Sequence, residues 1–229
     1  MQSQDSFLLS YIKYGDSDAV LHCFSRENGF ESFFCRGVYS PKNRKKAYLF
    51  PLNEIRIFIL DGRSSSSLKN ISKIEQRGEQ YSFDNPKLNT VLFFVADFLN
   101  QVLRRETECR AVYQEIQSFV KESFAGNLTA HFALVFNMLK YLGIAPLTEK
   151  GKFLDPETGT FSDDPLHILF NEEVSALWIK FSLASNPYEI KLTHQEKKKF
   201  LETLMLYYRY HFADFREPAS LEVLQQIYD

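Results

Sequence analysis

Over the first 75 or so positions, hydrophobic and polar residues alternate with a period of two, which is typical of short β-strands. The alternation is clearest at Ile55, Ile57 and Ile59, which predict one buried face on a strand over residues 52–60. Four further strands, separated by turn residues, are predicted at residues 7–14, 19–25, 30–36 and 68–75. Five short strands with a long connection after the third predict a small closed barrel, for which the OB-fold is the commonest design. An SH3-like barrel would give nearly the same pattern, so both alternatives stay open.

Beyond residue 84 the hydrophobic period changes to about 3.6, which predicts helices. We expect Asn85 to cap the first of them, with Pro86 as its first residue. Residues 144–165 are rich in Gly, Pro and acidic side chains, so we expect a loop there, with a short hairpin. The fold class is therefore α+β with two domains. These are an N-terminal five-stranded OB-fold β-barrel over residues 1–80 and an all-α helical domain over residues 81–229.

Charge is divided unevenly between the two predicted domains. Residues 1–80 hold 12 Lys and Arg against 9 Asp and Glu, a net charge of +3. Residues 81–229 hold the remaining 15 against 20, a net charge of -5, and the whole chain is at -2. A general nucleic-acid surface is thus expected on the barrel and not on the helical domain.

The connection after the third strand carries four cations within five positions. An anionic partner would relieve their mutual repulsion, and a polyphosphate backbone is the simplest such partner. The alternative is a solvated connector that binds nothing. On the first interpretation Arg36 contacts phosphates together with the loop cations, and Tyr39 or Tyr48 stacks on a base. Arg56 extends the phosphate path if its side of the strand faces the groove. The loop cations are Lys42, Arg44, Lys45 and Lys46.

The sequence offers no motif for catalysis. It contains no phosphate loop of the Walker type and no Gly-x-Ser-x-Gly elbow, and its five histidines are scattered without metal-ligand spacing. The acidic residues of the 144–165 loop imitate a nuclease cluster only weakly. No enzyme, metal or cofactor is therefore predicted. Three widely spaced cysteines indicate reduced thiols in a cytosol, and no apolar run approaches the roughly 20 residues of a membrane span.

Segments in matching order along nearly the whole chain resemble the RecO family of bacterial DNA repair proteins. They include Phe7 to Asp18, Phe34-Cys-Arg-Gly-Val, Ser40-Pro-Lys-Asn-Arg through Phe50-Pro-Leu, Ala96-Asp-Phe-Leu, Phe132 through Leu142-Gly-Ile-Ala-Pro, and Tyr207-Tyr-Arg-Tyr-His-Phe. Many members of the family carry four zinc-binding cysteines after the Leu-Gly-x-x-Pro segment. Residues 148–164 of this chain contain none, so we predict no zinc.

The resemblance implies a cytoplasmic, nucleoid-associated protein that binds single- and double-stranded DNA and anneals complementary strands. It also implies loading of the recombinase RecA onto SSB-coated DNA, with RecR and the acidic C-terminal tail of SSB as partners. Arg104, Arg105 and Arg110 are the basic residues expected to accept such an acidic tail. The alternative is an adaptor whose helical domain recruits repair partners while the basic loop is incidental.

Overall fold

The computed structural model describes residues 2–40, 44–60, 68–77, 84–106, 109–147 and 151–226. The chain forms two compact units, residues 1–120 and residues 121–229. The first unit contains the five strands of the barrel and continues through Val120, within the second α-helix. The predicted boundary at residue 80 instead marks the change from strands to helices, and it stays a prediction.

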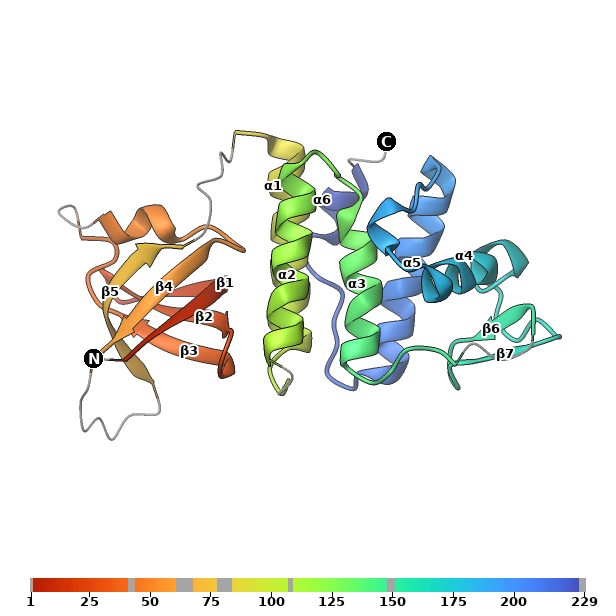
Figure 1. Cartoon of the computed structure of the whole chain (residues 1–229), viewed down its shortest axis with the longest axis horizontal. Helices are drawn as coiled ribbons and strands as arrows, with labels where there is room; N and C mark the ends of the chain where they lie inside the picture. Colours follow the sequence, from red (N-terminus) through yellow and green to blue (C-terminus); the bar gives the residue numbers. More distant parts are fainter. Residues whose placement is uncertain are drawn as a thin grey trace. The chain divides into compact units, whose positions relative to one another are not determined.

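The first unit is built around a closed five-stranded barrel, which confirms the predicted OB-like fold (Figure 1). The strand order is β1-β2-β3-β5-β4, and β1 closes the barrel because its first half pairs with β4 and its second half with β2. All neighbours are antiparallel except β3 and β5. The strands are β1 (Gln2–Tyr14), β2 (Asp18–Ser25), β3 (Gly29–Cys35), β4 (Glu54–Ile59) and β5 (Lys69–Gln76).

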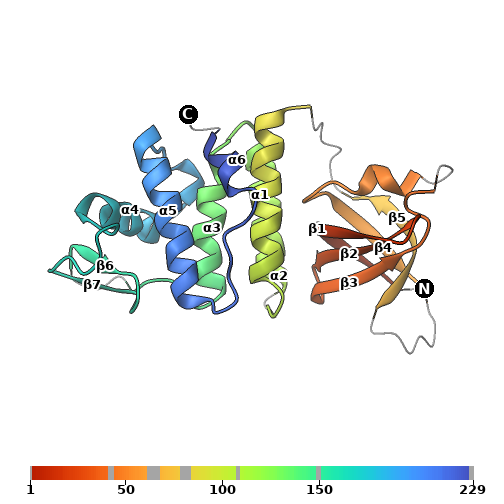
Figure 2. The same ribbon diagram turned by 180° about the vertical axis from the view of Figure 1, so that it is seen from behind.

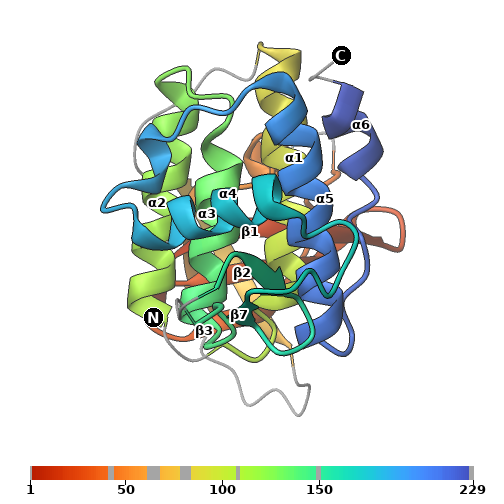
Figure 3. The same cartoon turned by 90° about the vertical axis from the view of Figure 1, so that its right-hand side faces the viewer.

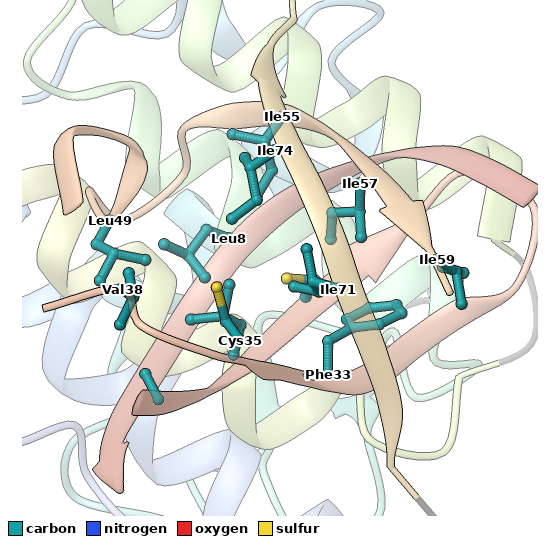
Figure 4. Close-up of a cluster of buried hydrophobic side chains, with 13 residues drawn as sticks. Leu8, Phe33, Cys35, Val38, Leu49, Ile55, Ile57, Ile59, Ile71 and Ile74 are labelled. Carbon is teal, nitrogen blue, oxygen red and sulfur yellow. The ribbon is translucent and has the colours of Figure 1, made fainter. Parts of the chain in front are cut away.

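Alternate residues of these strands point inward and form the barrel core (Figure 4). Ile55 and Ile57 are completely buried and Ile59 is nearly so, as the alternation predicted. Cys23 and Cys35 are free thiols in the same core. Predicted and observed strand ends differ by one or two residues, except that β1 starts five residues earlier than predicted. Strand β4 starts only at Glu54 because Leu52 adopts a left-handed backbone, with φ of 60°, which an extended strand cannot contain.

The expected start of the first helix is confirmed. Asn85 accepts hydrogen bonds from the backbone N–H groups of Lys87 and Leu88, and Pro86 is the first residue of α1. Thr193 and Glu196 form a reciprocal capping box at the start of α5. The helices, seen from behind in Figure 2, are α1 (Pro86–Val102), α2 (Cys109–Phe124), α3 (Ala130–Tyr141), α4 (Glu172–Leu183), α5 (His194–His211) and α6 (Leu221–Gln225), with a short 3-10 helix η2 (Pro187–Glu189).

In the second unit, α4 crosses α3 and α5 (Figure 3). Aromatic rings fill the space between these helices, with Trp178, Phe136 and Phe200 in mutual contact. The prediction of an all-α domain is wrong in one detail, since β6 (Phe153–Asp155) and β7 (Thr160–Ser162) form the hairpin that the loop composition suggested. Across the described ranges, no helix is both long and apolar enough to span a membrane.

Candidate nucleic-acid interface

Two hydrogen bonds tie the turn after β3 to the turn between β1 and β2. Asp18 Oδ1 accepts a hydrogen bond of 2.8 Å from the backbone N–H of Gly37. The carbonyl of Ser17 accepts one of 2.9 Å from the N–H of Tyr39. Gly37 has φ of 63°, a backbone that suits glycine and lets the chain turn sharply there. The segment that carries Arg36 and Tyr39 is therefore held against the end of the first hairpin.

The Asp18 carboxylate is engaged by its own chain. The Gly37 N–H and then the Ser17 hydroxyl stabilise its ionised form, which lowers the pKa of Asp18 below its ordinary value. The Asp18 carboxylate therefore stabilises the turn and is not an isolated negative charge at this end of the barrel.

Lys13, near the end of β1, joins the same region although the sequence analysis did not select it. Its ammonium group lies 5.7 Å from the centroid of the Tyr39 ring, a cation–π contact. Tyr11 lies nearby, and burial, with a smaller contribution from Tyr11, raises the pKa of Tyr39. The Tyr39 phenol is therefore neutral at physiological pH and adds no negative charge beside the lysine.

The basic segment after residue 43 is not an irregular loop, as we expected, but a 3-10 helix, η1 (Arg44–Tyr48). Lys46 is exposed and Lys45 is half-buried. Tyr48 and Tyr39 both pack partly against the barrel core, which anchors the helix and the preceding turn to the barrel. Lys42 and the side chain of Arg44 lie outside the described residues.

The helix η1 lies close to the end of β3, because Tyr48 at its end packs against the core cluster that includes Cys35. Burial raises the pKa of the Cys35 thiol, and the nearby positive charge of Lys45 partly opposes that rise. Arg36 follows Cys35 directly, is exposed, and holds its guanidinium 6.0 Å from the centroid of the Phe34 ring. We call Lys13, Arg36, Lys45 and Lys46, together with Tyr39, the cationic rim.

Arg56 lies elsewhere on the barrel. It sits in β4 opposite Asp5, and its guanidinium donates to both carboxylate oxygens, with Nε–Oδ1 at 2.7 Å and Nη2–Oδ2 at 3.0 Å. Arg77 Nε donates to Asp5 Oδ2 at 3.1 Å. Asp5 and Lys13 are separated by eight residues of β1, about 25 Å along a strand. The structure therefore does not bring Arg56 to the cationic rim, and its predicted DNA contact stays a prediction.

The paired Asp5 predicts how stability responds to acid. Hydrogen bonding to Arg56 is the largest cause that lowers the pKa of Asp5 below its ordinary value of 3.8. A lowered folded-state pKa contributes stability that is present above 3.8 and is lost as the pH falls through the folded value. In urea unfolding followed between pH 2 and pH 7, Asp5→Asn should reduce the free energy of unfolding at neutral pH. The difference from wild type should shrink below about pH 4. A difference that is constant across this range would contradict the pairing.

The three arginines expected to bind an acidic tail all lie in the first unit. Arg104 and Arg105 follow the end of α1, and Arg110 is in the first turn of α2, with all three exposed. Arg104 Nε donates to the carbonyl of Asn100 at 3.1 Å, and its guanidinium lies 5.8 Å from the Phe30 ring centroid. Arg104 thus contributes charge beside β3, while its aromatic contact limits its freedom.

The β6–β7 hairpin lies in the segment where we predict no zinc, and side-chain hydrogen bonds hold its turn together. Asp155 accepts from the Glu157 N–H at 3.1 Å and from the Thr158 hydroxyl at 2.7 Å. Leu154 N–H donates to Ser175 Oγ at 3.0 Å, which ties the hairpin to α4. Within the ranges that the structure describes, no group of three or more His, Cys, Asp or Glu side chains is placed to hold a metal ion.

The predicted absence of zinc can be tested on the purified chain. Elemental analysis after dialysis against zinc-free buffer should give well below one zinc per chain. Treatment with a chelator should leave the thermal unfolding midpoint unchanged, because the hairpin is held by its own hydrogen bonds and its packing on α4. A stoichiometric zinc ion, or a lower midpoint with chelator, would contradict the prediction.

The chain is similar to known proteins along its whole length. The family model described as "Recombination protein O N terminal" matches residues 1–78, which include the barrel. A protein from Phocaeicola vulgatus named DNA repair protein RecO is 28% identical over 244 residues, covering 100% of this chain and 99% of that protein. RecO from Flavobacterium psychrophilum is 25% identical over 234 residues and 97% of both chains, and RecO from Bacteroides fragilis is 25% identical over 245 residues and 100% of both. The chain is thus similar along its full length to these proteins, each of which is named DNA repair protein RecO.

Proposed function

We propose that this chain is a recombination mediator that binds DNA backbones at the cationic rim of its barrel. The observation that carries the proposal is the convergence of lysine and arginine side chains from three separate segments, the end of β1, the turn after β3 and η1. The similar proteins are named as DNA repair and recombination proteins. A mediator that acts by binding needs no catalytic residues, which agrees with the prediction that the chain is not an enzyme.

The physical basis is the release of counterions. Each phosphate that a lysine or arginine neutralises frees condensed cations, so affinity falls with salt by about 0.7 logarithmic units per contact on single strands and about 0.9 on duplex. The rim carries cations on fixed turns beside a neutral phenol, Tyr39. Such a surface holds single- and double-stranded DNA without reading sequence.

Annealing and recombinase loading follow from this surface in the proposal. Two complementary strands anneal faster when their phosphate charge is screened and their bases remain available for pairing. The exposed arginines Arg104, Arg105 and Arg110 offer a separate basic set for the acidic C-terminal tail of SSB. With RecR as a second partner, the protein would then deliver RecA to SSB-coated strands.

The adaptor alternative has one observation in its favour. The second unit exposes large apolar side chains, with Leu166 at 62% and Ile168 at 89% exposure. Exposed apolar groups of this size are compatible with a protein partner. On this alternative the helical part recruits repair proteins and the barrel contributes no affinity for DNA.

A titration of fluorescently labelled oligonucleotides with the full chain separates the two functions. We expect binding of single strands and duplexes at 50 mM salt, with affinity that falls steeply by 300 mM. Mixing complementary labelled strands should show faster pairing with the protein than without it. Absence of DNA binding at low salt would reject the mediator function and leave the adaptor.

A further inference from the structure

We propose that Tyr14 and Phe34 form a base-stacking platform beside the cationic rim, which makes this site prefer single-stranded over duplex nucleic acid. The inference rests on the proposed DNA binding and adds to it the residues that decide strand type. Neither residue was predicted from the sequence as a nucleic-acid-binding residue.

The platform lies on the outer face of the sheet formed by β1, β2 and β3. Strand register places Ile12 opposite Val20 and Val20 opposite Phe34, so these three side chains form one row across three strands. Tyr14, two residues beyond Ile12 on the same face, contacts Phe34 edge-on, with ring centroids 5.5 Å apart and planes at 80°. The result is a continuous apolar row that ends in two aromatic rings.

The apolar side chains at this end of the row are largely exposed to solvent. Tyr14 is 61% exposed and Ile12 is 59% exposed. At the other end of the same face, Phe24 is completely buried and has no surface left for a ligand. The exposed end is therefore the part of the face with apolar surface left for a ligand.

Charge complementarity identifies the ligand. The Arg36 guanidinium lies over the Phe34 ring, 6.0 Å from its centroid, so a positive charge borders the aromatic pair. The nearest acidic side chain in the strand register, Asp18, is engaged by the Gly37 N–H. Aromatic faces next to cations suit a ligand with flat apolar rings on a polyanionic backbone, which is single-stranded nucleic acid.

Duplex DNA cannot use the aromatic part of this surface. Its bases are paired and stacked on one another, so it presents phosphates to the cations but no free base face to the rings. Stacking of one base on an aromatic side chain strengthens binding by about 5- to 150-fold and tolerates any base. The platform should therefore contribute to single-strand affinity alone.

The test compares strand types in one pair of variants of the full chain. Tyr14→Leu with Phe34→Leu keeps apolar volume but removes both rings. We expect at least about fivefold weaker binding of an oligothymidine, unchanged binding of a duplex of equal length, and an unchanged salt slope. Tyr14→Phe with Phe34→Tyr keeps the rings and should bind like wild type. Tyr210→Leu, which removes a tyrosine of 42% exposure from the second unit, is the matched control.

The outcomes distinguish this inference from the proposed function. If the wild type binds no DNA, the proposed function fails and the platform with it. If the wild type binds but the leucine variant keeps its single-strand affinity, or loses single-strand and duplex affinity equally, the platform alone is overturned. Photocrosslinking of wild type to an iodouracil oligonucleotide covers the case of a variant that does not fold. Crosslinks at Tyr14 or Phe34 support the platform, and crosslinks exclusively elsewhere overturn it.

Discussion

Replacement of Lys42, Arg44, Lys45 and Lys46 by glutamine should lower the affinity for single-stranded DNA by two to three orders of magnitude at about 0.1 M salt. The estimate follows from four lost phosphate contacts, which remove about 2.8 from the slope of log affinity against log salt. Because the contacts are made to phosphates, the loss should be the same for all sequences. Fluorescence anisotropy at several salt concentrations measures both the affinity and the slope.

The matched control neutralises a basic run of similar density in the second unit. Lys197, Lys198 and Lys199 lie in the first two turns of α5, and Lys199 is paired with Glu173. Their replacement by glutamine should leave affinity and slope within about twofold of wild type. Equal losses in both variants would show that overall charge, and not the segment that carries Lys45 and Lys46 of the rim, determines binding.

Phe33→Ala should cost about 3–5 kcal/mol of unfolding free energy, because the side chain is completely buried in the barrel core. The neighbouring Phe34→Ala should cost less than about 1 kcal/mol, since Phe34 lies on the outer face and is half-exposed. The two changes remove the same atoms from adjacent positions of β3. Urea unfolding followed by circular dichroism gives both values.

The two alanine variants, Phe33→Ala and Phe34→Ala, test the register of β3 directly. A one-residue shift would exchange the inner and outer faces of the strand, and the two costs would then be reversed. Similar costs for both changes would contradict the closed barrel. A further contrast is expected in DNA binding, where Phe34→Ala should weaken single-strand binding while leaving the protein folded.

Local physics made most of the fold predictable. The alternation of Ile55, Ile57 and Ile59 required one buried face, and the barrel supplies it. Asn85 and Thr193 stand where helix N-caps must satisfy backbone N–H groups, and both do so. Closure of the barrel depended on β1 pairing with two partners at different halves, a long-range property that no local pattern contains.

The candidate site was less predictable, because the exposure of its side chains depends on the point at which β1 extends beyond the barrel core. Lys13 lies opposite Ala19 in register, a position that reads as inward, yet it is exposed because β1 continues past the core. Clustering of Tyr11, Lys13 and Tyr14 at one strand end was the available signal. Arg56 shows the opposite case, since its partner Asp5 is 51 residues away and only the barrel brings the two together.

The most direct test of the account is a lysine footprint of the full chain with and without a single-stranded oligonucleotide. Acetylation followed by mass spectrometry reports the reactivity of each lysine. We predict that Lys13, Lys45 and Lys46 become several-fold less reactive when DNA is bound, while Lys197 and Lys198 do not change. Saturating DNA that leaves the three barrel lysines fully reactive, or protects lysines only within residues 121–229, would contradict DNA binding at the cationic rim.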